Sequence, residues 1–202
     1  MNEGIMFTKS LTQIGERTIP QHITVRVESG IPGFSIPGIN STKVRTIRDR
    51  IRAAIISSRY DWPQKRLTVR LPFYIAVTSP GWDLAIAMGI LSASGQISKR
   101  ICQNTFFVGE LGLDGRVRCS GEMTEILGYD NAVGDRIVVS SDCSLVDQLG
   151  YTPNDLVRVP NLKSSVSILE TLAACSWQTR QNEFASSAAP FQEMAEYCDW
   201  DD

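Results

Sequence analysis

Arginine is the residue type whose spacing points most clearly to a binding surface in this chain. Arg45, Arg48 and Arg52 lie at positions i, i+3 and i+7 of a segment whose apolar residues recur at the helical period. Side chains at these positions share one side of a helix, so the guanidinium groups are expected to form a stripe. Such a stripe can neutralise phosphates and gain affinity by releasing counterions. The sequence therefore predicts nucleic-acid contact, with a solvated face or a salt-bridged subunit contact as the alternatives.

The basic character extends along the neighbouring chain. From Lys43 to Arg70 there are nine basic residues and only two acids, Asp49 and Asp61. The candidate nucleic-acid-binding residues are Arg45, Arg48, Arg52, Arg59, Lys65 and Arg66. Two aromatic residues, Tyr60 and Trp62, lie beside them in the sequence. Aromatic side chains in this position either stack on bases or pack the helix against the core.

Motifs for nucleotide hydrolysis and cofactor binding are missing from the sequence. A Walker loop needs a Gly-Lys dipeptide, because the lysine neutralises phosphate charge, and that dipeptide occurs nowhere. Gly33 and Gly38 have the glycine spacing of such a loop, but Ile39 and Asn40 follow them. The single histidine, His22, is expected to be a turn residue before a strand rather than a catalytic base. We therefore expect no cofactor.

The cysteines indicate reduced thiols rather than a disulfide framework. They are five in number and scattered, at positions 102, 119, 143, 175 and 198. An odd count without a Cys-x-x-Cys pair is typical of a cytosolic chain and gives no zinc-ligand spacing. We expect no metal site.

Hydrophobic periodicity divides the chain into interleaved strands and helices. Strands are expected at residues 22–28, 66–71, 106–111, 116–118, 136–139 and 156–159. Helices are expected at 41–59, 82–94, 122–133, 142–149 and 166–174, with a loop at 30–38. The 82–94 helix is apolar nearly all round and should be buried on every side. This order predicts an α+β fold, with α/β character in a mixed sheet.

Several runs of residues, in order along the chain, resemble one bacterial family. The runs are Val27–Ile39, Lys43–Ser58, Arg66–Leu71, Asp83–Ala87 and Val108–Gly115. They are similar to the Gly-Pro-rich opening, the arginine helix, the next strand, the Asp-Leu-Pro-Ile-Ala segment and the Gly-Glu-Leu segment of the ComM/YifB proteins. These are also called magnesium chelatase-like proteins. The resemblance covers residues 7 to 174 and implies the ribosomal S5 domain 2-like fold of the Lon proteolytic domain.

The same resemblance implies that the proteolytic machinery of Lon is lost. In Lon-type proteases a serine attacks the substrate, and a buried lysine with a lowered pKa activates it. The resemblance places Gly81 at the serine position and Thr124 at the lysine position. Trp82 adds bulk beside the first of these positions. Asp83, at the start of a buried helix, is expected to satisfy free amide donors there. We therefore expect no enzyme activity.

ComM proteins, as the resemblance implies, are hexameric AAA+ motors that act on DNA in recombination, branch migration and transformation. Their ATPase domain has no counterpart in these residues, so motor function is not expected. The leading hypothesis is a non-catalytic Lon-like module for binding or oligomerisation. It would form homo-oligomers or join the rings of a ComM-like AAA+ ATPase, and it would present the Arg45–Arg52 face to DNA or to an acidic surface.

Two other hypotheses stay open. One is a Lon-like serine peptidase with a displaced dyad, in which Ser79 or Ser120 pairs with Lys65 or Lys99. The other is a regulator whose acidic tail docks on the basic helix as a DNA mimic. Its motivation is the stretch from Glu183 to Asp202, which has six acids and neither Lys nor Arg.

The bulk composition is that of an ordinary globular chain. Hydrophobic residues make up 43%, charged residues 21%, and the net charge is −2. There is no apolar leader and no run of 18 apolar residues, so we expect a cytoplasmic protein without membrane contact. We expect residues 1–22 to begin the fold, 23–174 to form the Lon-like domain, and 175–202 to form a flexible acidic tail.

Overall fold

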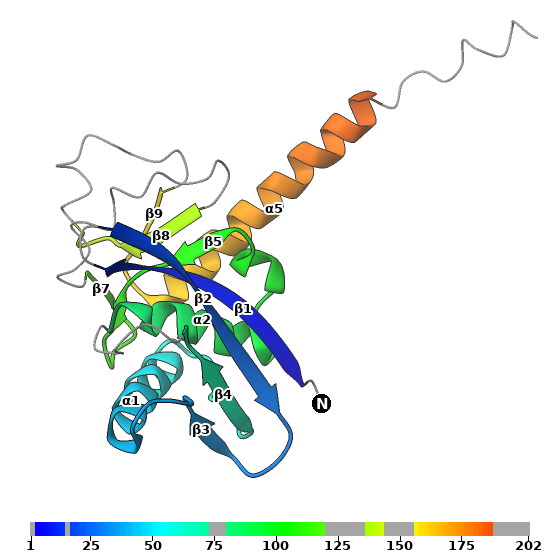
Figure 1. Cartoon of the computed structure of the whole chain (residues 1–202). Helices are drawn as coiled ribbons and strands as arrows, with labels where there is room; N and C mark the ends of the chain where they lie inside the picture. The colour runs from blue at the N-terminus through cyan, green and yellow to red at the C-terminus, as the bar shows by residue number, and fades with distance from the viewer. Residues whose placement is uncertain (1–2, 15–16, 73–79, 120–135, 144–155, 188–202) are drawn as a thin grey trace, which may run out of the picture.

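The structure is a computed structural model of the 202-residue chain, and it describes residues 3–14, 17–72, 80–119, 136–143 and 156–187. Strands and helices interleave along these residues (Figure 1). The strands are β1 Gly4–Ile14, β2 Arg17–Glu28, β3 Gly33–Ser35, β4 Arg66–Arg70, β5 Thr105–Phe107, β6 Glu110–Leu111, β7 Val117–Arg118, β8 Arg136–Ser140 and β9 Leu156–Val159. The helices are α1 Ser41–Ser57, α2 Asp83–Ala93 and α5 Leu162–Ser187, with short 3₁₀ helices η1 Pro80–Trp82 and η2 Lys99–Cys102.

The described strands form a seven-stranded sheet in the order β3-β4-β2-β1-β5-β8-β9, and β6 pairs with β7 in a separate two-stranded sheet. Strand β2 pairs antiparallel with both β1 and β4, with Val25 opposite Met6 on one side and Val69 on the other. The β3–β4, β1–β5, β5–β8 and β8–β9 pairs are parallel. The predicted α+β class with a mixed sheet is confirmed.

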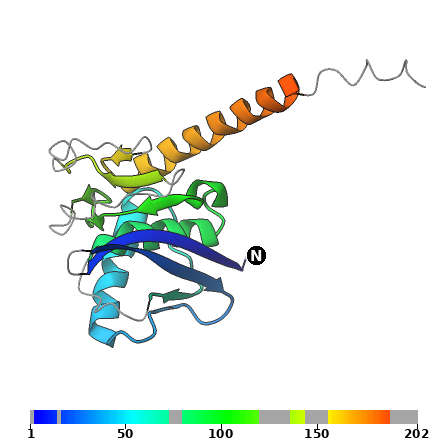
Figure 2. The ribbon, with the colours of Figure 1, turned by 45° about the horizontal axis from the view of Figure 1, so that its top comes forward.

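Helix α2 packs across one face of the sheet, against β1 and β2 (Figure 2). Every residue of α2 is buried, as its nearly uniform apolar composition predicts. Gly89 permits the close approach, because a Cβ atom there would lie 2.6 Å from Cγ2 of Val25. The centre of the main core therefore lies between α2 and the middle strands.

Helix α1 packs beside α2 through the predicted apolar stripe. Asn40 caps its first turn by accepting a hydrogen bond from the Lys43 amide at 2.9 Å, while Ile51 and Ile55 are fully buried. At the other end, the Tyr60 amide donates to the Ile55 carbonyl, and Arg59 adopts a left-handed conformation with φ 69°. The predicted helix at 41–59 is confirmed, and it ends in a turn that glycine usually occupies.

A second, smaller core lies on the opposite face of the sheet. Consecutive residues of a strand point to opposite faces, so Phe107 joins the main core while Phe106 joins the smaller one. The smaller cluster contains Leu11, Phe106, Val108, Ile137, Val139 and Cys143. Farther along β1 on that face, Phe7 is 64% exposed. The two faces of the sheet are therefore covered unequally by the described residues.

Strand β1 and the first half of β2 are missing from the sequence prediction. Three α2-facing positions of β1 hold the hydroxyl residues Thr8, Ser10 and Thr12, and only Met6 on this face joins the apolar core, which hides the alternation. Their polar atoms are satisfied: Thr8 Oγ1 donates to the Ala85 carbonyl at 3.1 Å, and Ser10 Oγ donates to the Phe107 carbonyl at 2.8 Å. The prediction that His22 is a turn residue is wrong, because it lies inside β2 and is exposed.

Two further predictions about strands are wrong. The expected strand at 106–111 breaks at Gly109, whose N–H donates to the Gly81 carbonyl and whose carbonyl accepts from the Leu84 amide. A Cβ at Gly109 would lie 2.6 Å from Val117, so the chain leaves the large sheet where only glycine fits. In addition, the expected loop at 30–38 contains β3, which pairs parallel to β4.

Helix α5 is longer than the expected 166–174 helix. It begins at Leu162 and continues to Ser187, so part of the expected flexible tail is helical. No glycine or proline stands between these residues, and nothing local stops the helix. Residues 188–202 and the expected helices at 122–133 and 142–149 lie outside the described residues. Within the described part of the chain, no helix is long and apolar enough to span a membrane.

Candidate nucleic-acid interface

A shallow groove of about 350 Å³ opens between β3 and the first half of α1. We call it the α1 groove. It is lined by Phe34, Ser35, Ile36, Ile39, Ser41, Val44, Arg45 and Arg48. None of these eight residues is acidic. The groove thus combines an apolar floor, two hydroxyl groups and two guanidinium groups.

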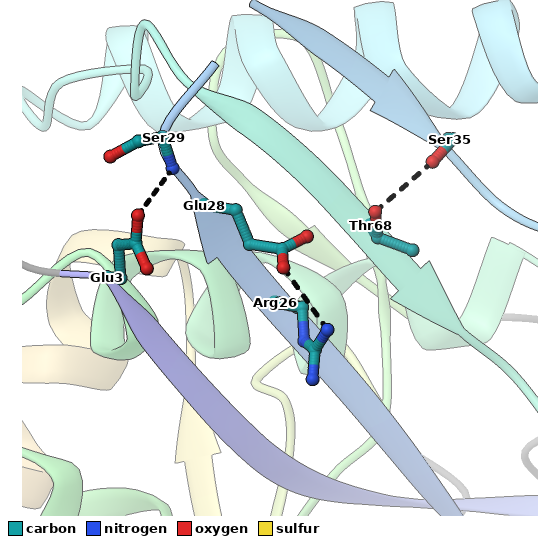
Figure 3. A network of polar contacts seen from close by, with 6 residues as sticks. All are labelled: Glu3, Arg26, Glu28, Ser29, Ser35 and Thr68. Atoms are coloured by element: carbon teal, nitrogen blue, oxygen red, sulfur yellow. Dashed lines mark hydrogen bonds and ion pairs between the residues drawn. The ribbon is translucent and has the colours of Figure 1, made fainter.

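The segment that leads into the groove is tied to the sheet by polar contacts (Figure 3). The Ser29 amide donates to the Glu3 carboxylate at 3.1 Å. Hydrogen bonds from the side chain and from the backbone of Ser29 lower the pKa of Glu3. Ser35 Oγ lies 3.4 Å from Thr68 Oγ1 on β4 (Figure 3). The Ile39 amide then closes a turn onto the Ile36 carbonyl. The wall of the groove opposite α1 is therefore fixed at both of its ends.

The floor of the groove rests on aromatic packing. The rings of Phe34 and Trp62 lie 5.9 Å apart between centroids, at an interplanar angle of 46°. Both rings and Tyr60 pack against the main core, and burial raises the pKa of Tyr60. Of the two readings of Tyr60 and Trp62, core packing is the one that the structure shows.

Two of the six predicted basic residues meet in the α1 groove. Arg45 is exposed at its rim, and Arg48 is partly exposed and pairs with Asp49, with 2.7 Å between Nη2 and Oδ1. Arg52 is exposed one turn farther along α1 and does not line the groove. The predicted stripe is therefore real as a feature of one helix, but Asp49 offsets part of its charge.

The other three predicted residues lie elsewhere. Arg59 occupies the turn that ends α1. Lys65 and Arg66 lie where β4 begins, opposite the start of β3, where Lys65 acts electrostatically on Glu3 and the Arg66 guanidinium approaches Gly30. The structure therefore does not gather the six residues into one surface.

The sequence prediction missed an ion pair that joins α1 to α2. Arg50 Nε lies 2.5 Å from Asp83 Oδ2, and Nη2 lies 3.0 Å from Oδ1. The Leu111 amide also donates to Asp83, at 3.2 Å. Burial raises the pKa of Asp83 to about 6, against the lowering by Arg50 and Leu111. The carboxylate thus links α1, α2 and β6.

This geometry corrects the role expected for Asp83. It does not cap its own helix: Trp82 is the N-cap residue, and the Leu84 amide donates to the Gly109 carbonyl. The spacing of 33 residues between Arg50 and Asp83 hid the pair from local sequence patterns.

Of the two positions that the resemblance assigns to the Lon dyad, Gly81 and Thr124, the structure describes only the first. Gly81 is buried in η1, and its carbonyl accepts from the Gly109 amide at 2.9 Å. Trp82 is 3% exposed and donates from Nε1 to Thr12 Oγ1 at 3.0 Å. Thr124, Ser79 and Ser120 lie outside the described residues, whereas Lys65 is half-buried and Lys99 is exposed. Across the described segments, no group of three or more His, Cys, Asp or Glu residues could hold a metal ion.

Comparison with known proteins shows where this arrangement belongs. The family model for subunit ChlI of Mg-chelatase matches residues 23–142, which is more than half of the chain. The chain belongs to this family. It is 33% identical to YifB of Escherichia coli over 145 residues, which are 70% of this chain and 28% of YifB. It is 34% identical to competence protein ComM of Haemophilus influenzae over 143 residues, which are 68% of this chain and 28% of ComM.

The resemblance to the ComM/YifB proteins is therefore confirmed. The chain spans little more than a quarter of the length of either relative. The matched region contains the α1 groove, the Arg50–Asp83 pair and Gly81.

Proposed function

We propose that this chain is a non-catalytic binding module that contacts the phosphate backbone of DNA through the α1 groove. The observation that carries the proposal is the groove itself, whose eight lining residues include Arg45 and Arg48 and no acid, while Asp49, which pairs with Arg48, lies outside the lining. Arginine suits such a contact because its planar guanidinium group can donate two parallel hydrogen bonds to one phosphate, and two arginines within one helix turn provide two such groups.

The surrounding structure favours an anionic partner. Ser41 lies at the start of α1 and lines the groove, so the positive end of the helix dipole adds to the charge of the arginines. Ser35 and Ser41 supply hydroxyl groups that can donate to phosphate oxygens. The lining side chains are expected to contact phosphates rather than the edges of bases. Binding should therefore depend strongly on salt concentration and little on the DNA sequence.

The non-catalytic part of the proposal rests on the neighbourhood of Gly81. Glycine offers no nucleophile, and the adjacent Trp82 side chain is buried and hydrogen-bonded to Thr12. We infer that the fold is that of ribosomal S5 domain 2 and the Lon proteolytic domain, kept here for binding.

The family relationship extends the proposal to partners. The relatives YifB and ComM are bacterial, and ComM is by name a competence protein. We propose a role beside ComM-type recombination proteins in the cytoplasm, with a ComM-like AAA+ ATPase or a second copy of this chain as protein partner.

Fluorescence anisotropy with labelled single-stranded and duplex DNA tests the central part of the proposal. The doubly substituted Arg45→Ala, Arg48→Ala chain is expected to lose at least tenfold in affinity at low salt. A matched control removes two charges elsewhere, Lys99→Ala with Arg100→Ala, on the exposed surface of η2. The control should bind as the unaltered chain does. No binding by the unaltered chain at low salt, or equal loss in both variants, would refute the proposal.

A further inference from the structure

Two cysteines that are distant in the sequence meet at the edge of the smaller core. Cys119 follows β7 and Cys143 follows β8, 24 positions later. Their Sγ atoms lie 2.6 Å apart, and both residues are thiols in the structure. Cys143 is fully buried in the smaller cluster, and Cys119 packs against it while remaining partly exposed.

The backbone on both sides of the pair is held in place. Ser140 Oγ donates to the Val117 carbonyl at 2.7 Å and so joins the strand ends that precede the two cysteines. The Cys143 amide donates to the Ser140 carbonyl at 3.2 Å, and Arg158 Nη1 donates to the Cys143 carbonyl at 2.9 Å. The approach of the sulfur atoms is therefore set by the fold and not only by side-chain rotation.

The separation distinguishes between the two chemistries that paired thiols support. A metal ion held at about 2.3 Å by each of two thiolates would keep the sulfurs about 3.8 Å apart in a tetrahedral site. The observed 2.6 Å is too short for that arrangement. It is only about half an ångström longer than the roughly 2.05 Å bond of a disulfide.

We propose that Cys119 and Cys143 are an oxidisable dithiol that small disulfides of the glutathione-disulfide class convert into an intramolecular disulfide. The Cys119 sulfur, which is the accessible one, attacks the disulfide of the oxidant and releases one glutathione thiol. Cys143 then attacks Sγ of Cys119, and the second glutathione thiol leaves. The two cysteines are oxidised, the oxidant is reduced, and the two cysteine protons end on the two glutathione thiols.

The environment makes this reaction slow at neutral pH. Burial, with the neighbouring Cys143, raises the pKa of Cys119 to about 12. Because only the thiolate attacks, the rate of oxidation is expected to rise about tenfold for each pH unit from 7 to 9. A thiol of ordinary acidity would instead approach a plateau at the upper end of this range.

Peptide mapping of the full-length chain tests the proposal directly. The chain is incubated with glutathione disulfide, blocked with an alkylating reagent and digested with trypsin without reduction. Cleavage after Arg118, Arg136 and Arg158 leaves Cys119 in peptide 119–136 and Cys143 in peptide 137–158. The expected product is these two peptides joined, and dithiothreitol should separate them.

Buried Cys102, in peptide 101–116, serves as an internal control and should be recovered unpaired. The Cys143→Ser variant should stop at a glutathione adduct on Cys119. Oxidation should also raise the thermal midpoint of the unaltered chain by about 5–10 °C, and leave that of the variant unchanged. A glutathione adduct as the final product of the unaltered chain, or linkage of either cysteine to Cys102, Cys175 or Cys198, would overturn the proposal. So would the absence of any oxidation at pH 9.

Discussion

Arg50 and Asp83 form a two-point ion pair between α1 and the start of α2, with 2.5 Å and 3.0 Å separating their paired atoms. The Asp83 side chain is 3% exposed and that of Arg50 is 23% exposed. Arg50 lies on the same helix as Arg45 and Arg48, so the pair ties the helix that carries the α1 groove to the start of α2. The contribution of this ion pair to the free energy of unfolding can be measured directly.

Removing Arg50 alone should be costly. Arg50→Met leaves the Asp83 carboxylate buried without its cation, and we expect the free energy of unfolding to fall by about 3 kcal/mol. Adding Asp83→Leu should recover most of this loss, because two apolar side chains can fill the site without a charge. Urea unfolding of the two variants checks this. A double variant that is no more stable than Arg50→Met would contradict it.

Asp83 should also make stability depend on pH. Its pKa is raised to about 6 in the folded chain, from an ordinary value of 3.8, so the folded state holds the proton to higher pH than the unfolded state. The stability that this contributes is fully present below about pH 4 and is lost as pH rises through about 6. We therefore expect the unfolding free energy of the unaltered chain, relative to Asp83→Asn, to fall between these values. A relative stability that rises with pH in that window would show that Arg50 dominates instead.

Arg59 should be replaceable by glycine with a gain in stability. It adopts φ 69° at the end of α1, a conformation that costs an L-residue roughly 1 kcal/mol and costs glycine little. Arg59→Gly is expected to raise the free energy of unfolding by about 1 kcal/mol in chemical denaturation. Arg59→Ala keeps the strain and should give no comparable gain. Equal effects of the two changes would rule out the backbone explanation.

Gly89 should be needed for its small size rather than for its flexibility. Alanine is intrinsically better in a helix by about 1 kcal/mol, but its Cβ would lie 2.6 Å from Val25 Cγ2. Overpacking costs about 1–3 kcal/mol, so Gly89→Ala should destabilise the chain. In a Val25→Ala background the 2.6 Å contact is removed and the closest remaining atom, Cβ of residue 25, lies 3.3 Å away, so the same change should become neutral or slightly stabilising. A thermal or urea series on the four chains would reveal whether the sign reverses.

Elements with strong local patterns could be predicted from the sequence. The apolar stripe containing Ile51 and Ile55 gave α1, and the uniformly apolar run gave the fully buried α2. Strand β1 was not predicted because Thr8, Ser10 and Thr12 occupy inward positions of the strand. Whether such hydroxyl residues can be buried depends on hydrogen-bond partners elsewhere in the chain. Likewise, the break at Gly109 depends on hydrogen bonds to Gly81 and Leu84 that no local pattern encodes.

The candidate site was predictable only in part, for the same reason. Spacing along one helix identified Arg45 and Arg48, but the groove between them and Phe34 exists because β3 pairs with β4. Lys65 and Arg66 are near in sequence but project from the start of another strand. The Arg50–Asp83 pair joins residues 33 positions apart. Local charge counting therefore found the helix but not the boundaries of the surface.

The salt dependence of DNA binding tests the central claim most directly. The logarithm of the association constant for a labelled duplex is measured against the logarithm of salt concentration, for the unaltered chain, Arg45→Ala with Arg48→Ala, and Lys99→Ala with Arg100→Ala. Each phosphate contact contributes about 0.9 to the slope, so loss of two contacts should make the slope shallower by about 1.8 in the groove variant alone. Identical slopes for all three chains would contradict the claim that the α1 groove holds the phosphates.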